Sequence, residues 1–271
     1  INILKKNDII GLPTETVYGL AGNAYSNSAI KKIFKIKKRF KKNPLIIHYY
    51  NLDYAKKDVL LDKNFFKVYK KFSPGPITYI VKKKINSRIS LRACANLETV
   101  GIRFPRNKII RKLLKKLNFP LAMPSANKSS GVSPVKPLDV FEEFKNKIKI
   151  VDGGISKIGI ESTVLNLVGN ISILRPGIIT PKQIENVLNL KIKISPKQTT
   201  IKSPGSLKKH YSPGIPVHIN KKKCPEKYAF ITFGKKYPVT RNSFNLSRKS
   251  NLNEAAKNLY KFLRIIKTRG Y

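Results

Sequence analysis

The chain has 271 residues, 41% of them hydrophobic, which is enough for one large core or two smaller ones. Its 56 lysines and arginines stand against 14 aspartates and glutamates, so the formal net charge is +42. No apolar run reaches membrane-spanning length, and Cys94 and Cys224 lack the Cys-x-x-Cys spacing of a zinc or redox site. Membrane-spanning, disulfide-framework and cysteine-zinc classes are thereby disfavoured, and we expect a cytoplasmic protein.

The positive charge favours an anionic substrate or a nucleic-acid partner. The lysines are, however, spread over every predicted helix instead of forming one stripe. Lysine is also accompanied by abundant Ile and Asn, as in residues 191–194, which codon usage in an AT-rich genome produces by itself. An RNA or tRNA contact therefore stays open without being indicated.

In chain order, the first clear helix is predicted over residues 28–38, where apolar residues recur at helical spacing after Ser26 and Ser28, two possible caps. Residues 45–50 are apolar and β-branched, which is typical of a buried strand. The cleanest amphipathic helix covers residues 109–117, and Thr180 followed by Pro181 begins another. Further strands are predicted at residues 77–81, 99–104, 119–123, 148–151, 162–167 and 171–174.

This alternation predicts an α/β domain, residues 1–195, around a twisted mixed sheet. Residues 196–214 contain Ser203-Pro204-Gly205 and Ser212-Pro213-Gly214 and are predicted to be a linker. Strands at 217–219 and 228–233 and a helix from Leu252 indicate a second α/β domain over residues 215–271. The chain does not begin with methionine and stops soon after this helix, so we expect a fragment whose second domain is incomplete.

Polar side chains are densest between Pro13 and Leu20, directly after a short apolar strand. One interpretation is a capped turn in which Thr14 or Thr16 satisfies backbone donors. The other is the wall of a site. On the segment alone, the capped turn is slightly favoured. Taken with the later loops, the segment becomes one wall of a site, in which Glu15 and Tyr18 would merely shape the turn.

Two further segments could bind phosphate. Lys37 and Arg39 end a predicted helix, where the macrodipole favours cations, but together they could also clamp a polyphosphate. Residues 123–134 leave a strand and carry several serines, Asn127 and one glycine, which suits a ligand loop at a strand end. A serine-rich surface loop is the alternative, since the segment lacks the P-loop ending.

Arg103 lies inside an apolar strand, where an unpaired guanidinium is costly to bury. Its partner could be a carboxylate ligand or an internal glutamate, and nothing local separates the two. His48 and His210 could act as an acid–base pair, but isolated histidines are more often simple hydrogen-bonding residues. The sequence shows no Ser-His-Asp elbow, no His-x-x-x-His and no paired metal carboxylates.

Seven ordered blocks together resemble the YrdC-like family, and the last, in the linker, is similar to the long, two-domain form found among threonylcarbamoyl-AMP synthases. The blocks are Pro13-Thr14-Glu15-Thr16-Val17-Tyr18-Gly19, Lys37-x-Arg39, Asn43-Pro44-Leu45, Pro124-Ser125-Ala126-Asn127 with Ser133-Pro134, Glu161-Ser162-Thr163-Val164, Arg175-Pro176-Gly177, and Ser203-Pro204-Gly205 through His210-Tyr211-Ser212-Pro213.

The resemblance implies a YrdC-like twisted mixed sheet with flanking helices, followed by a linker and a partial Rossmann-like domain. It also implies a nucleotidyltransferase that joins L-threonine, bicarbonate and ATP into threonylcarbamoyl-AMP and pyrophosphate for threonylcarbamoyladenosine in tRNA. Mg²⁺ would be bound mainly through the substrate phosphates, with no metal site of the protein's own. A downstream tRNA threonylcarbamoyl transferase would receive the product.

The matched positions imply the site residues. L-Threonine would contact Thr16, His48, Arg103, Met123 and Thr163. ATP would contact Arg39, Asn43, Thr99, Ser125, Ser133, Arg175 and Tyr211, with Tyr211 folding over the nucleotide as a lid. The catalytic group would be Lys37, Arg39, Ser125 and Asn127.

Two positions depart from the family pattern: Phe40 stands where proline usually follows Lys-x-Arg, and Met123 stands where a small residue usually precedes Pro-Ser-Ala-Asn. Met123 would narrow the pocket unless its flexible side chain turns away. A non-catalytic basic RNA-binding module of the same fold is the alternative function. A hydrogenase-maturation carbamoyl-transfer module is a third, but two cysteines cannot supply that family's zinc fingers.

Overall fold

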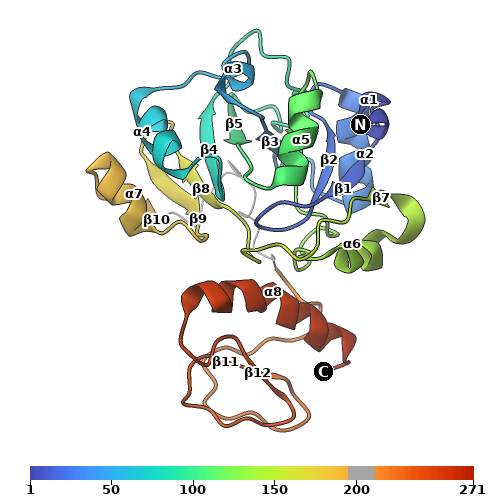
Figure 1. Ribbon diagram of the computed structural model, residues 1–271, viewed down its shortest axis with the longest axis vertical. Coiled ribbons are helices and arrows are strands. Elements are labelled where there is room, and N and C mark those ends of the chain that lie inside the picture. Colours follow the sequence, from blue (N-terminus) through green and yellow to red (C-terminus); the bar gives the residue numbers. More distant parts are fainter. Residues whose placement is uncertain (195–210) are drawn as a thin grey trace.

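A computed structural model describes residues 1–194 and 211–271. Its largest feature is a ten-stranded sheet in the order β10-β9-β8-β4-β5-β3-β6-β2-β1-β7 (Figure 1). The sheet contains parallel pairs such as β3 with β5 and antiparallel pairs such as β4 with β5. The mixed sheet with flanking helices that the sequence predicts is therefore confirmed. The strands are β1 (Ile10–Leu12), β2 (Gly19–Asn23), β3 (Ile46–His48), β4 (Ile77–Lys82), β5 (Thr99–Arg103), β6 (Leu121–Ala122), β7 (Lys149–Ile150), β8 (Thr163–Asn166), β9 (Ser172–Arg175) and β10 (Lys193–Ile194).

The helices begin where short polar side chains satisfy their first backbone donors. In α2 the Ser26 Oγ accepts from the Ala29 N–H at 3.3 Å, and in α7 Thr180 and Gln183 form a reciprocal capping box. The helix predicted at 28–38 thus runs one residue earlier at each end. The helices are α1 (Asn2–Lys5), α2 (Asn27–Lys37), α3 (Leu52–Ala55), α4 (Lys63–Phe72), α5 (Lys108–Lys116), α6 (Pro137–Phe144), the 3₁₀ turn η1 (Lys145–Lys147), α7 (Pro181–Leu188) and α8 (Leu252–Thr268).

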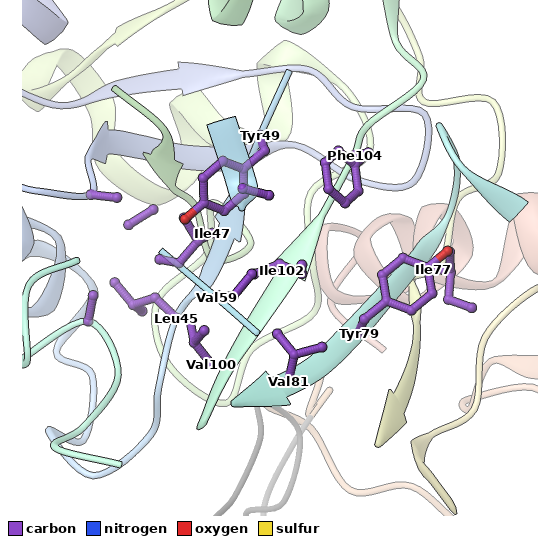
Figure 2. Packing of buried hydrophobic residues seen from close by; sticks show 14 of the residues in the cluster. Leu45, Ile47, Tyr49, Val59, Ile77, Tyr79, Val81, Val100, Ile102 and Phe104 are labelled. Atoms are coloured by element: carbon purple, nitrogen blue, oxygen red, sulfur yellow. The ribbon is translucent and has the colours of Figure 1, made fainter. Parts of the chain in front are cut away.

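The central strands have two different faces, because successive side chains of a strand point to opposite sides. On one face, alternate residues of β3, β4 and β5 and those next to them build the main core, which Figure 2 shows around Ile47, Tyr79 and Ile102. On the other face lie His48 and Arg103, which are direct partners in the parallel pairing of β3 with β5. The hydrophobic alternation thus commits one face to stability and leaves the other for polar function.

A second apolar cluster, centred on Leu12, Ile110 and Leu121, packs α5 against β1 and β6. Both clusters hold the strands whose ends approach the same polar face. The packing of these two clusters therefore fixes the positions of the strand ends without help from loop residues.

The C-terminal segment contains α8 and a two-stranded parallel sheet of β11 (Phe230–Thr232) and β12 (Ser243–Asn245). Figure 1 shows α8 between this pair and the large sheet. The strand predicted at 217–219 is wrong: Val217 and Ile219 are exposed and pair with no strand in the described part of the chain. Of the helices described, none is long and apolar enough to cross a bilayer. Ser203-Pro204-Gly205 and His210 lie outside the described residues, and the predicted domain boundaries stay predictions.

Candidate functional site

A small cavity of about 40 Å³ opens at the polar face of the sheet, where β3 ends at His48 and β5 ends at Arg103. Segments that are far apart in the sequence meet here because β8 is parallel to β4 and antiparallel to β9, so the start of β8 and the end of β9 reach the same edge. The cavity is lined by Thr14, Thr16, Val17, Gly19, Arg39, Ile46, His48, Arg103, Met123, Pro124, Ser125, Glu161, Ser162 and Arg175.

The turn between β1 and β2 is both a capped turn and a cavity wall. The Thr14 hydroxyl accepts from the backbone N–H groups of Thr16 at 3.1 Å and Val17 at 3.2 Å and donates to the Val17 carbonyl at 2.6 Å. This is the local capping that the sequence predicts. Thr14 and Thr16 nevertheless line the cavity, so the two interpretations of the segment are compatible.

Arg103 has an internal partner. Its Nη2 donates to Glu15 Oε1 at 2.7 Å and to Thr16 Oγ1 at 2.9 Å. The second oxygen of Glu15 accepts from the backbone N–H groups of Arg106 at 3.0 Å and Asn107 at 3.2 Å. The expectation that Glu15 only shapes the turn is therefore wrong, because its carboxylate is the counterion that makes a buried guanidinium tolerable.

The Arg103 side chain keeps one unused donor. Its Nε is buried and has no hydrogen-bond partner among residues 1–194 and 211–271. A buried donor without an acceptor is costly unless a ligand supplies one. Arg103 therefore suits an anionic ligand in the cavity in addition to Glu15.

His48 enters the cavity as a neutral group. Burial, with the positive charge of Arg103 second, lowers the pKa of His48 to about 3. Its Nδ1 lies 3.2 Å from the Ile46 carbonyl oxygen. The imidazole can therefore hydrogen-bond a ligand without adding a second positive charge beside Arg103.

A second buried ion pair, between Arg175 and Glu161, also lines the cavity. Glu161 also accepts hydrogen bonds from Ser133 Oγ and from the Tyr211 hydroxyl, both at 2.7 Å. Arg175 donates from Nε to the Ser162 carbonyl and from Nη2 to the Ser162 hydroxyl, both at 3.0 Å. Glu161 thus gathers three of the predicted nucleotide-binding residues around one carboxylate.

Arg39 completes the cationic lining. Its Nη2 donates to Asn43 Oδ1 at 2.6 Å and to the Pro44 carbonyl at 2.9 Å, which fixes the turn after α2. Phe40 in this turn is about half exposed and does not line the cavity. Burial lowers the pKa of Arg39 to about 10. The Glu161 carboxylate opposes this shift and the Arg175 charge adds to it, and Arg39 stays charged at neutral pH.

Lys37 does not line the cavity. It contacts the loop of residues 123–134, here called the ligand loop. Its Nζ donates to the backbone carbonyls of Ser125 and Asn127, and the side chain is fully buried. Burial, with Arg39 second, lowers the pKa of Lys37 to about 7. The lysine therefore holds the loop from behind and carries only part of its usual charge at neutral pH.

Met123 lies against the backbone of Gly19. A Cβ added at Gly19 would lie 2.4 Å from Met123 Cγ and 2.8 Å from its Sδ. Met123 also lines the cavity and is buried. The side chain thus narrows this end of the pocket, and it fits there because position 19 has no side chain.

The structure brings together most, not all, of the predicted site residues. Those on the cavity wall are Thr16, Arg39, His48, Arg103, Met123, Ser125 and Arg175. Those that hydrogen-bond a residue of this wall are Lys37, Asn43, Ser133 and Tyr211. Asn127 and Thr163 bond residues that do not line the cavity. Thr99 starts β5 at the end away from Arg103 and is not on this wall, so its nucleotide contact stays a prediction.

Sequence reasoning missed two carboxylates and one hydroxyl as site residues: Glu15, Glu161 and Ser162. The Glu161-Ser162-Thr163-Val164 block was a usable signal, because it places a carboxylate and two hydroxyl groups together at the start of a strand. Glu15 offered no such signal. Its partner Arg103 is 88 residues away, and only the pairing of strands brings the two together.

The described residues contain no group of three His, Cys, Asp or Glu side chains that could hold a metal ion. The two cavity-side acids are already engaged by arginines. This donor set does not fit a tightly bound resident cation, and Mg²⁺ carried in on an anionic ligand stays a prediction.

Two family models match the chain. The Sua5/YciO/YrdC model, described as telomere recombination, matches residues 2–177. A model described as the C-terminal domain of threonylcarbamoyl-AMP synthase matches residues 179–269.

Curated relatives and a solved structure agree with these models. The chain is 38% identical to the threonylcarbamoyl-AMP synthase of Bacillus subtilis (strain 168) over 80% of its length, and 37% identical to that of Pyrococcus abyssi over 79%. The chain covers 64% of the length of each relative. A crystal structure of P. abyssi Sua5 complexed with L-threonine superposes with a TM-score of 0.87 at 30% identity, covering 99% of this chain and 84% of that one.

The Glu15–Arg103 pair predicts a pH-dependent stability. Burial alone would raise the pKa of Glu15, but the Arg103 charge and the hydrogen bonds outweigh it and hold the pKa below its ordinary value. We therefore expect Glu15→Gln to reduce the free energy of unfolding by about 3 kcal/mol near neutral pH. The deficit should shrink as the pH falls from about 4.3, the ordinary pKa of glutamate, through the lower pKa of Glu15 in the folded protein. Below that pKa the Glu15 carboxylate of the wild-type protein is itself protonated and has lost its charge.

Urea unfolding over a pH series measures this deficit. The exposed Glu226→Gln is the matched control and should change the free energy of unfolding by less than about 0.5 kcal/mol. A Glu15→Gln deficit that stays constant down to acid pH would contradict the assignment.

The contact between Gly19 and Met123 predicts a compensating pair of substitutions. Gly19→Ala should destabilise the protein by about 1–3 kcal/mol, because the new Cβ overlaps Met123. Met123→Ala removes the overlapping atoms, so the double variant should be more stable than the sum of the single effects by about 1 kcal/mol or more. Additive losses in denaturant unfolding would show that the contact is not the cause.

Proposed function

This chain belongs to the Sua5/YciO/YrdC family, and from that premise we propose that it is a threonylcarbamoyl-AMP synthase. It would join L-threonine, bicarbonate and ATP and release pyrophosphate, which is an adenylyl transfer. The observation that carries the proposal is one cavity lined by two cationic groups: Arg103 beside a neutral His48, and Arg39 with Arg175 around Glu161. We assign each group to one end of the site.

The Arg103 end suits the amino acid. The Arg103 side chain lines the cavity and would pair with the threonine carboxylate, while Glu15 holds the guanidinium in place. Thr16 and His48 offer neutral hydrogen-bonding groups for the threonine hydroxyl and amine. Met123 narrows the cavity and would exclude bulky side chains of a bound amino acid. Thr163, which bonds the Ile179 carbonyl at 2.8 Å, would support this wall from the second layer.

The Arg39 and Arg175 end suits the nucleotide. Two guanidinium groups on one wall favour polyphosphate, since arginine binds phosphate oxygens in bidentate fashion. Ser125 lines the same cavity, on the loop that Lys37 holds. Asn43, Ser133 and Tyr211 would act through Arg39 and Glu161, to which they are bonded.

The chemistry needs alignment more than a nucleophilic side chain. The threonine amine adds to bicarbonate and loses water, which leaves a carbamate. A carbamate oxygen then forms a bond to the α-phosphorus of ATP while the bond to the pyrophosphate oxygen breaks. Side chains that hold both substrates and neutralise charge developing on the phosphates suffice for this in-line transfer.

Mg²⁺ would accompany ATP and neutralise phosphate charge, held mainly by the phosphates themselves. Asn127 is the nearest candidate to assist, since its buried Oδ1 has no partner among the residues described. We further propose that the reaction occurs in the cytoplasm and that the product passes to a tRNA threonylcarbamoyl transferase.

The test is to incubate the protein with ATP, L-threonine and bicarbonate and to measure pyrophosphate. Release that depends on both L-threonine and bicarbonate would support the proposal. Release indifferent to threonine would overturn it. RNA binding without any such release would favour the non-catalytic basic module instead.

Arg103→Ala should separate the two ends of the cavity. We expect the threonine-dependent rate at subsaturating threonine to fall about 100-fold, because the carboxylate loses a charge-assisted bond, while ATP affinity changes little. Calorimetric titration with each ligand measures this, with the exposed Arg92→Ala as control. Equal loss of ATP binding would show that the division of the pocket is wrong.

A further inference from the structure

The outer side of the nucleotide end is covered by α8. An apolar cluster joins Val17, Val132 and Val135 of the site loops to Tyr260 of this helix. The approach is close, since a Cβ added at Gly159 would lie 2.6 Å from the Lys257 Cα. Gly159 is two residues from Glu161, so the helix is packed directly on the loop that carries the central carboxylate.

Arg264 on α8 closes a ring around the ligand loop. Its Nη2 donates to the Val132 carbonyl at 2.7 Å and to Glu143 Oε1 at 2.9 Å. The other oxygen of Glu143 accepts from the Lys128 backbone N–H at 3.0 Å. Residues 128–132 are thereby held at both ends, and Ser133, which bonds Glu161, follows directly.

Tyr260 lies one helical turn before Arg264 and contacts Tyr211. Its ring stacks on that of Tyr211, with centroids 5.4 Å apart and an interplanar angle of 28°. Tyr211 in turn donates to Glu161. One face of α8 thus touches two of the three residues that bond this carboxylate, Tyr211 and Ser133.

At the threonine end the contact of α8 is apolar: Tyr260 packs in one cluster with Val17, the residue after Thr16. Within residues 1–194 and 211–271, no hydrogen bond or ion pair joins the helix to Glu15, Thr16 or Arg103. Arg103 is held by Glu15 and Thr16, which belong to the turn between β1 and β2. From this asymmetry we infer that Tyr260 and Arg264 are positioning residues for the nucleotide end of the cavity, so that α8 sets ATP affinity and leaves L-threonine affinity largely unchanged. The inference rests on the proposed function.

The test is to measure dissociation constants for ATP and for L-threonine separately, on the whole chain. Arg264→Met should weaken ATP binding about tenfold or more, since a charge-assisted clamp is lost, with threonine binding changed less than about twofold. Tyr260→Leu should do the same. Lys261→Met, which alters an exposed cation on the same helix, is the control and should change neither constant.

A conservative variant guards against simple unfolding. Arg264→Lys keeps a cation for Glu143 but cannot reproduce the forked contact with both Glu143 and Val132, so it should recover only part of the ATP affinity while restoring thermal stability.

Equal weakening of both ligands, or ATP binding unaffected in a folded Arg264→Met, would overturn the inference. A wild-type protein that binds both ligands without threonine-dependent pyrophosphate release would overturn the proposed function alone. A wild-type protein that does not bind ATP would overturn both.

Discussion

Two buried guanidinium groups, Arg103 and Arg175, are the constraint around which this site is built. Each lies at a strand end on the polar face of the sheet, where an unpaired cation would be costly. Each is compensated by a carboxylate from a preceding loop, Glu15 and Glu161. The loops therefore cannot take other conformations without leaving a buried charge unpaired, and this fixes the cavity walls.

Internal compensation also shapes what the cavity offers a ligand. Glu15 and Thr16 both bond Nη2 of Arg103, so this cavity-lining guanidinium is held in one position before a ligand arrives. His48 stays neutral beside it because burial and that same cation disfavour its protonation. The arrangement is preorganised electrostatics: charge is placed by folding and not by ligand binding.

The nucleotide end depends on a wider part of the chain than the threonine end. Glu161 receives Arg175, Ser133 and Tyr211, and two of these contacts are backed by α8 through Tyr260 and Arg264. A helix that the second family model covers is thus structurally continuous with the site of the first. The two regions are best understood as one functional unit.

Local sequence patterns were sufficient wherever the determining contacts are local. Apolar periodicity and capping side chains predicted α2, α5 and α7 and most strands, because helix ends and strand faces depend on near neighbours. The ordered motifs indicated the family and seven residues on the cavity wall. The strand predicted at 217–219 failed because an apolar run becomes a strand only where a partner strand is available.

Tertiary structure alone decided which groups are paired. The sequence left Arg103 with two possible partners, and only the meeting of strand ends identified Glu15, 88 residues away. The same holds for the gathering of contacts on Glu161 and for Met123 against Gly19. Charge pairing and close approach act between residues that are distant in the chain, so the sequence determined the parts and the folded sheet determined their partners.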